Sequence, residues 1–309
     1  MKIGVLTDSS AYLTPQQCAD NGIKVIPIPI IWNKQVYHDM VNIGFHEFYE
    51  KLATASTLPS TSQPSIGDIQ KYVDSYVEAG YTDLIIVTIS SGLSGFYENV
   101  LSIAKTEKRI NIHPFDSKIT CAGQANAALL AGKLVKKGAD IDLIMHDLED
   151  LRNTTDVRFV VDNLQHLKRT GRLSNAASFV GSLLRITPIL SMDVQDKGKI
   201  SAISKERKYQ RAYNRIQQDF TKLITDLPYP VQLTIFHADD IERETAWLED
   251  YEEKFPQVEI NSSIIGPVVG THVGQHTIAM IWSRNINSYF DQDGQPLPAS
   301  EIHSPIVED

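Results

Sequence analysis

Short apolar runs alternate with amphipathic segments through the first half of the chain. The apolar runs predict buried strands at residues 3–8, 23–31, 84–89 and 110–115. The amphipathic segments predict helices at residues 45–54, 66–80, 95–108, 121–137 and 142–153, and another helix begins at Pro15 with Thr14 as its N-cap. Pro27 and Pro29 make the second strand an edge strand or a broken one. This alternation is typical of an α/β fold in which helices cover both faces of a parallel sheet.

The pattern changes near residues 154–156, where the strand-like runs become longer and the connections less regular. Strands are predicted at residues 157–161, 186–194, 200–207, 232–237, 258–264 and 277–282, with a turn at residues 196–198. Helices are predicted at residues 163–167, 175–183, 209–225 and 239–255. We therefore expect two domains, an N-terminal parallel-sheet α/β domain at residues 1–155 and a C-terminal α/β domain at residues 156–309. The polar end, residues 291–309, is expected to be loosely held.

Composition limits the partners of such a protein. The hydrophobic content of 42% over 309 residues suits a globular chain, and a net charge of −9 argues against nucleic acid bound through a basic surface. No apolar run reaches the ~18 residues of a membrane helix, so we expect a cytoplasmic protein that is not inserted in a membrane. Cys18 and Cys121 have no metal-ligand spacing and are too few for a disulfide framework. Neither a bound metal nor another cofactor is expected.

Three segments rich in small hydrogen-bonding residues lie far apart in the sequence. The clearest is residues 90–95, which read Ser-Ser-Gly-Leu-Ser-Gly between a predicted strand and a predicted helix, where hydroxyls and free backbone N–H groups can hold an anion. The others are the hydroxyl cluster at residues 60–65 and the glycine-histidine stretch at residues 266–274. Taken alone, such clusters are usually turns and helix caps. Together they indicate one site assembled by the fold.

Five motifs make the resemblance to a known family specific. They are Thr7-Asp8-Ser9-Ser10-Ala11, Thr61-Ser62-Gln63-Pro64-Ser65, Ser90-Ser91-Gly92-Leu93-Ser94-Gly95, Leu167-Lys168-Arg169-Thr170-Gly171-Arg172-Leu173, and Gly266-Pro267 continued by Gly270-Thr271-His272-Val273-Gly274. In this order and spacing, which spans the chain to about residue 284, they resemble the DegV family of bacterial fatty-acid-binding proteins, which includes the binding subunits of fatty acid kinase.

The resemblance implies that one long-chain fatty acid is buried in a tunnel between the two domains. Carried over by position, the carboxylate-binding residues are Thr61, Ser62, Ser94 and His272. The resemblance gives a supporting role in the pocket to four other residues, which are Ser9, Ser91, Gly95 and Gly270. Hydroxyl donors suit this role, because a buried carboxylate without donors costs several kcal/mol.

The resemblance also implies a carrier rather than a catalyst. In kinase-associated members, a separate ATP-binding fatty acid kinase subunit phosphorylates the bound carboxylate for phospholipid synthesis, and Arg172 is then the candidate kinase contact. A monomer is expected. Two departures from the family pattern concern the pocket and its rim, because Phe96 replaces a frequent Thr, and Gln275 and His276 replace a Pro-Gly pair.

Two other functions remain open at this point. A serine hydrolase would use Ser94 as nucleophile, His272 as base and Asp8 to orient the histidine, although the Gly-x-Ser-x-Gly elbow is absent around Ser94. A phosphosugar- or nucleotide-binding module would use the turn before the helix at residues 95–108, but neither a P-loop nor a convincing dinucleotide fingerprint is present.

Overall fold

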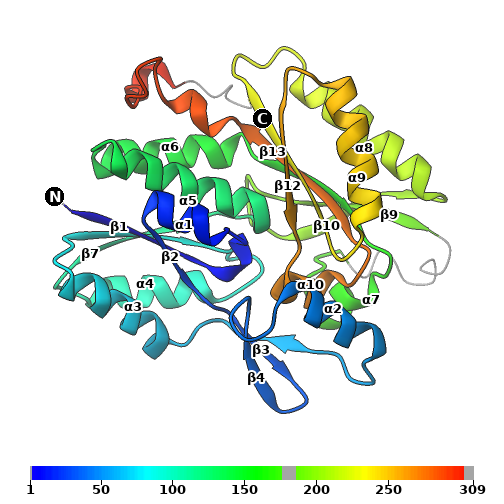
Figure 1. Ribbon diagram of the computed structural model, residues 1–309, viewed down its shortest axis with the longest axis horizontal. Helices are drawn as coiled ribbons and strands as arrows, with labels where there is room; N and C mark the ends of the chain where they lie inside the picture. Colours follow the sequence, from blue (N-terminus) through cyan, green and yellow to red (C-terminus); the bar gives the residue numbers. More distant parts are fainter. Residues whose placement is uncertain (1, 176–185, 303–309) are drawn as a thin grey trace.

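The first sheet is parallel and lies between two layers of helices in the computed structural model, which describes residues 2–175 and 186–302 (Figure 1). Its strands are β1 (Ile3–Asp8), β2 (Ile23–Ile26), β6 (Asp83–Thr88) and β7 (Asn111–Asp116), in the order β2-β1-β6-β7. Every residue of β1 and β6 is buried, as expected of central strands covered on both faces. The α/β fold class predicted from the sequence is confirmed.

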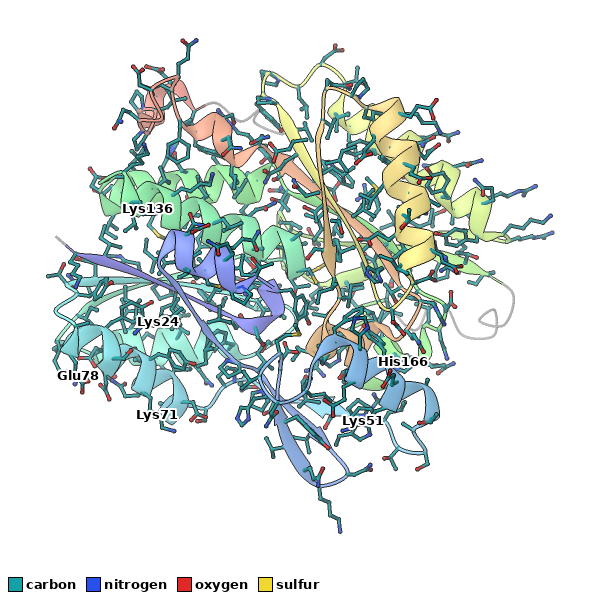
Figure 2. All side chains as sticks on the ribbon, viewed as in Figure 1. Lys24, Lys51, Lys71, Glu78, Lys136 and His166 are labelled. Carbon is teal, nitrogen blue, oxygen red and sulfur yellow. The ribbon has the colours of Figure 1, made fainter. Side chains whose placement is uncertain are left out.

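Helices cover the two faces of this sheet as the amphipathic segments predict. On one face lie α3 (Ile66–Glu78) and α4 (Phe96–Thr106), and on the other lie α1 (Pro15–Asn21), α5 (Cys121–Lys136) and α6 (Ile141–Asn153). Thr14 forms a capping box at the start of α1, where its side chain accepts the N–H of Gln17 and the Gln17 side chain accepts the N–H of Thr14. Figure 2 shows two charged side chains of α3, Lys71 and Glu78, directed away from the sheet.

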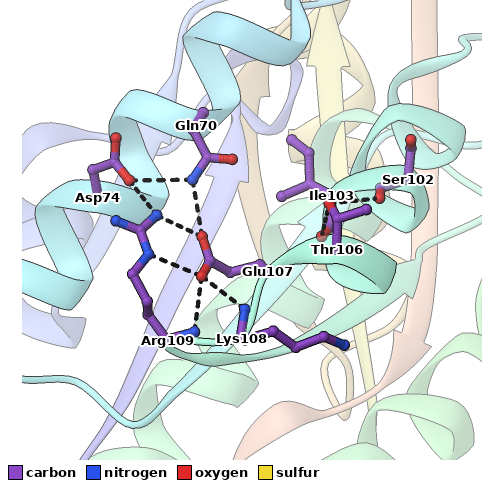
Figure 3. Close-up of polar contacts among 8 residues, drawn as sticks. All are labelled: Gln70, Asp74, Ser102, Ile103, Thr106, Glu107, Lys108 and Arg109. Atoms are coloured by element: carbon purple, nitrogen blue, oxygen red, sulfur yellow. Dashed lines mark hydrogen bonds and ion pairs between the residues drawn. The ribbon is translucent and has the colours of Figure 1, made fainter.

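An exposed polar network joins α3 to the end of α4 (Figure 3). Glu107, which follows α4, accepts hydrogen bonds from the backbone N–H groups of Lys108 and Arg109, at 2.8 Å each. The Arg109 guanidinium bridges Glu107 and Asp74 at 2.6 Å to each. These contacts hold the pKa of Glu107 well below its usual range, mainly through Arg109. The network fixes how α4 ends, at a position remote from the site described below.

The second sheet is mostly antiparallel. Its strands are β8 (Asp156–Val160), β9 (Thr187–Met192), β10 (Ile200–Glu206), β11 (Val231–His237), β12 (Glu259–Ile264) and β13 (Ile278–Arg284), in the order β10-β9-β8-β13-β11-β12. Only β11 and β12 are parallel neighbours within this sheet. Two helices, α8 (Tyr209–Ile224) and α9 (Ile241–Lys254), cover its outer face. The helix predicted at residues 163–167 is α7 (Gln165–Thr170), and the helix predicted at residues 175–183 lies almost wholly outside the described residues.

A small third sheet and two helices lie where the domains meet. The strand predicted at residues 23–31 is broken, as Pro27 and Pro29 indicate, because β2 ends at Ile26 and β3 (Pro29–Trp32) belongs to another sheet. The hairpin that β3 forms with β4 (Gln35–His38) was not predicted. β5 (Ser60–Thr61) pairs with β3 in the same sheet, and α2 (Phe45–Thr54) packs nearby. The sequence did not predict α10 (Pro267–Val273), which packs against α2, β3 and β5.

The last described segment, residues 286–302, packs on the first domain. The sequence instead predicted a second domain that extends to residue 309 and a loosely held end from residue 291. The short helices Ile286–Tyr289 and Ala299–Glu301 pack against α5 and α6. The Tyr289 hydroxyl donates to Asp150 on α6 at 2.6 Å, and Ile302 is 5% exposed. Two large side chains therefore anchor a segment whose surrounding sequence is polar.

The chain crosses between the domains twice, first between α6 and β8 and then after β13. The two crossings touch, since the Arg284 N–H donates to the Thr154 hydroxyl at 3.1 Å. Among the described residues, no helix is long and apolar enough to span a membrane. Within the same residues, no group of three or more His, Cys, Asp or Glu side chains is placed to hold a metal ion.

Candidate functional site

A small cavity of about 60 Å³ lies where loops of both domains meet. Its polar lining residues come from five separate segments and are Thr61, Ser62, Gln63, Ser94, Thr120, Arg172 and His272. Its apolar lining residues are Ile28, Ile89, Leu93, Ile200, Val268, Val269 and Val273. The structure thus brings together all four residues predicted to bind a carboxylate, and we call this space the head-group cavity.

Thr61 and His272 connect the two domains at the head-group cavity. Thr61 lies on β5 and His272 on α10, and the Thr61 Oγ1 lies 2.8 Å from the His272 Nε2. The other ring nitrogen of His272, Nδ1, is buried and has no hydrogen-bond partner among the described residues. The imidazole therefore has unused hydrogen-bonding capacity inside the molecule.

The surroundings of His272 keep it neutral. Burial lowers its pKa to about 3, and the nearby positive charges of Arg172 and Arg169 act in the same direction. His166 on α7 packs beside α10 (Figure 2). Gly274, directly after α10, leaves room for the His166 ring, and burial lowers the pKa of His166. With both histidines neutral, the two guanidinium groups make this region electropositive, which favours an anion.

The serine donors stand at the edge of the cavity. The Ser94 hydroxyl accepts the N–H of Phe96 at the start of α4, at 3.3 Å, and its own proton has no acceptor among the described residues. Ser62 is exposed, with its backbone N–H bound to the Pro29 carbonyl at 3.1 Å. Gly95 has no side chain in the cavity, but a Cβ there would lie 3.0 Å from the Gln63 side chain, so glycine lets the two loops approach.

Arg172 lines the head-group cavity, whereas the sequence placed it at a partner contact. It lies two residues after α7, and its Nε donates to the Leu93 carbonyl of the first domain at 3.3 Å. Arg169 reaches the same region and donates to the Pro59 carbonyl at 3.1 Å. Four residues near the cavity were not predicted as site residues, namely Arg169, His166, Gln63 and Thr120, although Arg169 and Gln63 lie in the five motifs.

The structure does not bring Ser9, Ser91 or Gly270 into the head-group cavity. The Ser9 hydroxyl donates to Asp39 at 2.7 Å, and the Ser91 hydroxyl donates to Asp116 at 2.5 Å. Gly270 lies on α10, where a Cβ would meet the Tyr49 hydroxyl at 2.5 Å. These residues position the chain around the cavity, and Gly270 does so by letting the helix that carries His272 pack closely on α2.

Asp8 also has a structural arrangement. Its carboxylate accepts hydrogen bonds from the backbone N–H groups of Ser10 and Ile89, at 3.0 and 2.8 Å. It also accepts from the Ser10 hydroxyl and, at 2.8 Å, from the Gln124 amide. With these four donors around it, Asp8 fixes the end of β1 and does not orient His272.

An apolar cluster fills the space between the domains next to the head-group cavity. Ile28, Val268 and Val273 line the cavity and belong to this cluster, which continues through Trp32 and Phe48. Its members from the second sheet are Val157, Phe159, Leu190, Met192, Ile200, Phe236, Ala279 and Ile281. Usual ligand pockets measure ~300–1,000 Å³. The cavity volume of about 60 Å³ therefore suits a head group, whereas a long acyl tail requires these side chains to move.

Sequence comparison assigns the chain to a family. Residues 2–285 match the family described as "Uncharacterised protein, DegV family". The chain belongs to the DegV family. It is similar to the protein DegV of Bacillus subtilis, with 34% identity over 286 residues that cover 91% of this chain and 99% of that protein. It is equally similar to a DegV domain-containing protein of Halalkalibacterium halodurans, with 34% identity over 281 residues that cover 91% and 98%.

Solved structures of DegV proteins have the same fold. Bacillus subtilis DegV, described as a fatty acid binding protein, is 32% identical with a TM-score of 0.85, covering 92% of this chain and 100% of that one. A fatty acid binding DegV family protein from Streptococcus agalactiae is 28% identical with a TM-score of 0.85, covering 92% and 99%. A DegV family protein from Thermus thermophilus, described by its fatty acid binding, is 25% identical with a TM-score of 0.84 and covers 92% and 100%.

Proposed function

We propose that this DegV protein binds one long-chain fatty acid between its domains, with the carboxylate in the head-group cavity and the tail in the adjoining apolar cluster. The observation that carries the proposal is the arrangement of Thr61, Ser62, Ser94 and His272 around one cavity that apolar side chains also line. The fatty acid binding of the related Bacillus and Streptococcus proteins supports it.

The binding energy suits this division between head and tail. Burying a tail of about fifteen methylenes contributes roughly 12 kcal/mol at ~0.8 kcal/mol per CH₂. Association and the movement of the apolar side chains oppose this, and association alone costs an estimated 4–15 kcal/mol. The tail then supplies most of the affinity, while the hydroxyls, His272 and the charge of Arg172 compensate the carboxylate for lost hydration.

The exposed rim of the head-group cavity supports a carrier function, in which the protein presents the bound carboxylate to a second protein. Ser62 and Gln63 are exposed at the rim, and Arg172 is only partly buried. In this proposal a separate ATP-dependent fatty acid kinase subunit docks over the rim and transfers a phosphoryl group to a carboxylate oxygen. Arg172 then faces both the carboxylate and the incoming phosphate, which widens the role predicted from the sequence. The chain itself acts as a non-catalytic, monomeric carrier.

The geometry disfavours the serine hydrolase. His272 lies against Thr61, its Nδ1 has no carboxylate partner among the described residues, and a pKa near 3 makes it a weak base. Asp8, the expected orienting acid, is held by Ser10, Ile89 and Gln124.

Mass spectrometry of the ligand released from purified, denatured protein tests the binding. We expect about one long-chain fatty acid per chain, and a reduced amount in the Ser94→Ala variant. A phosphosugar or nucleotide in its place would refute the proposal.

Incubation of the loaded protein with a fatty acid kinase ATP-binding subunit and ATP tests the second step. We expect acyl phosphate from the wild type and much less from Arg172→Gln at equal fatty acid occupancy. Full loading without any acyl phosphate would leave a fatty acid carrier and remove the kinase role.

A further inference from the structure

A second and larger space separates the domains on another side of the molecule. This cleft of about 800 Å³ lies between α1 and α5 of the first domain and β11 and β12 of the second. None of the described residues that line it also lines the head-group cavity. Its volume is within the range of ordinary small-molecule sites. We call it the polar cleft.

The wall from the second domain is unexpectedly polar for the inner face of a sheet. Along β11, Val231, Leu233 and Ile235 face the helices, while Gln232 and Thr234 alternate with them and line the polar cleft. Their neighbours in register on β12 are Glu259 and Asn261, which also line it. Thr234 is 7% exposed, and its hydroxyl has no hydrogen-bond partner among the described residues.

The wall from the first domain matches this polarity. Five residues at helical spacing on α5 line the cleft, namely Ala122, Ala125, Asn126, Leu129 and Lys133. The Asn126 amide makes no hydrogen bond to any described residue, although it has both donors and an acceptor. The Lys133 ammonium donates to Asn287 at 2.9 Å.

A buried acid at the cleft adds independent evidence for a ligand. Asp39 lines it and is 1% exposed, its Oδ2 accepts the Ser9 hydroxyl, and its Oδ1 has no partner among the described residues. A buried oxygen without a donor is costly and uncommon. A ligand hydroxyl would satisfy this oxygen after a small movement of the side chains that cover it.

We propose that the polar cleft binds an uncharged, polyhydroxylated small molecule that bridges Asn126 on α5 and Thr234 and Asn261 on the second sheet. Carboxamides and hydroxyls both donate and accept, so they match ligand hydroxyls, which do the same. Glu259 and the ionised form of Asp39 repel a phosphate group, and Lys133 is the one Lys or Arg among the described residues that line the cleft, so phosphorylated compounds are disfavoured. Apolar lining residues such as Leu129 and Ile264 suit the C–H face of a ring. Free sugars and nucleosides share this chemistry.

Saturation-transfer NMR on the full chain tests the proposal with glucose, N-acetylglucosamine, adenosine and uridine, each beside its phosphorylated form. We expect at least one neutral probe to bind with a Kd below about 1 mM and its phosphorylated form to bind more weakly. The sugar and nucleoside arms distinguish the two sources. Absence of binding by every neutral probe, or equal binding of the phosphorylated forms, would overturn the proposal.

Variants locate the binding. Thr234→Val keeps the shape of the side chain, and Asn126→Leu keeps its approximate size. Each substitution should weaken the binding of the neutral probe about fivefold to tenfold, because its hydrogen bonds to the probe are lost. Thr61→Val, in the head-group cavity, should leave the neutral probe unaffected. Thermal melting identifies any variant that fails to fold, in which case the other variant decides. Unchanged binding in a folded Thr234→Val or Asn126→Leu would contradict the proposed position.

Discussion

Replacing Thr61 with valine removes one hydroxyl from the head-group cavity with almost no change in volume. The hydroxyl lies 2.8 Å from the His272 Nε2, and in the proposed complex it also donates to the carboxylate. A hydrogen bond to a charged group contributes ~1.5–3 kcal/mol, so the Kd for a fatty acid should rise about 10-fold to 150-fold. Binding should remain measurable, because burial of the tail, worth roughly 12 kcal/mol before its costs, is unchanged.

The chain offers a matched control on the same strand. Ser60 precedes Thr61 on β5, is exposed, and does not line the head-group cavity. Ser60→Val should alter the Kd by no more than about twofold, as expected of an exposed position away from the site. The assay is displacement of a fluorescent fatty acid from delipidated protein, with melting temperatures measured in parallel. Equal Kd values for the Thr61 and Ser60 variants would refute the role given to Thr61.

Three further predictions concern stability. The pKa of His272 is about 3 in the folded protein against an ordinary 6.5, so the unfolded chain takes up its proton first as pH falls. Stability should therefore decline from about pH 6.5 downward by up to roughly 5 kcal/mol. In urea titrations His272→Asn should lose this decline, and an unchanged pH profile would contradict the assignment. Burial raises the pKa of Asp39 to about 7, while the Ser9 hydroxyl opposes this shift and the Asp8 charge adds to it. The stability of Asp39→Asn relative to wild type should therefore rise between pH 4 and 7, by up to roughly 4 kcal/mol. A stability difference that does not change with pH would argue against a buried Asp39. Gly92→Ala should destabilise by several kcal/mol in thermal melts, because its Cβ would lie 2.2 Å from the Lys197 carbonyl oxygen. The control is Gly67→Ala on α3, where a Cβ would meet only the Ser65 Oγ at 3.9 Å, and it should be neutral or slightly stabilising. Equal effects of the two substitutions would contradict the steric explanation.

The sequence predicted those elements whose pattern is set by local chemistry. The continuous apolar runs of β1 and β6 and the Thr14 cap of α1 need no knowledge of distant residues. The hairpin of β3 and β4 was missed because Pro27 and Pro29 obscure a strand pattern, and α10 was missed because Gly266 and Gly270 suggest turns. In the structure these glycines serve close packing, on Tyr12 and Tyr49 respectively.

The candidate site was likewise predicted where local sequence motifs suffice and missed where distant contacts decide. Motif position selected Thr61, Ser94 and His272, which the fold places around one cavity. It could not show that the hydroxyls of Ser9 and Ser91 are taken up by Asp39 and Asp116, because these partners lie 30 and 25 residues away in the sequence. Only three-dimensional proximity decides whether a hydroxyl is free for a ligand.

The contact between Thr154 and Arg284 ties the two interdomain passages into one hinge. Two adjacent chain connections permit the domains to rotate apart about one axis, and they resist twisting or sliding of one domain against the other. None of the described residues that line the head-group cavity belongs to these passages, so rotation about them would part the Thr61 and His272 sides and open the apolar cluster between the domains. The same double link means that truncation near residue 155 would leave the first domain without the Tyr289 segment that packs on α6.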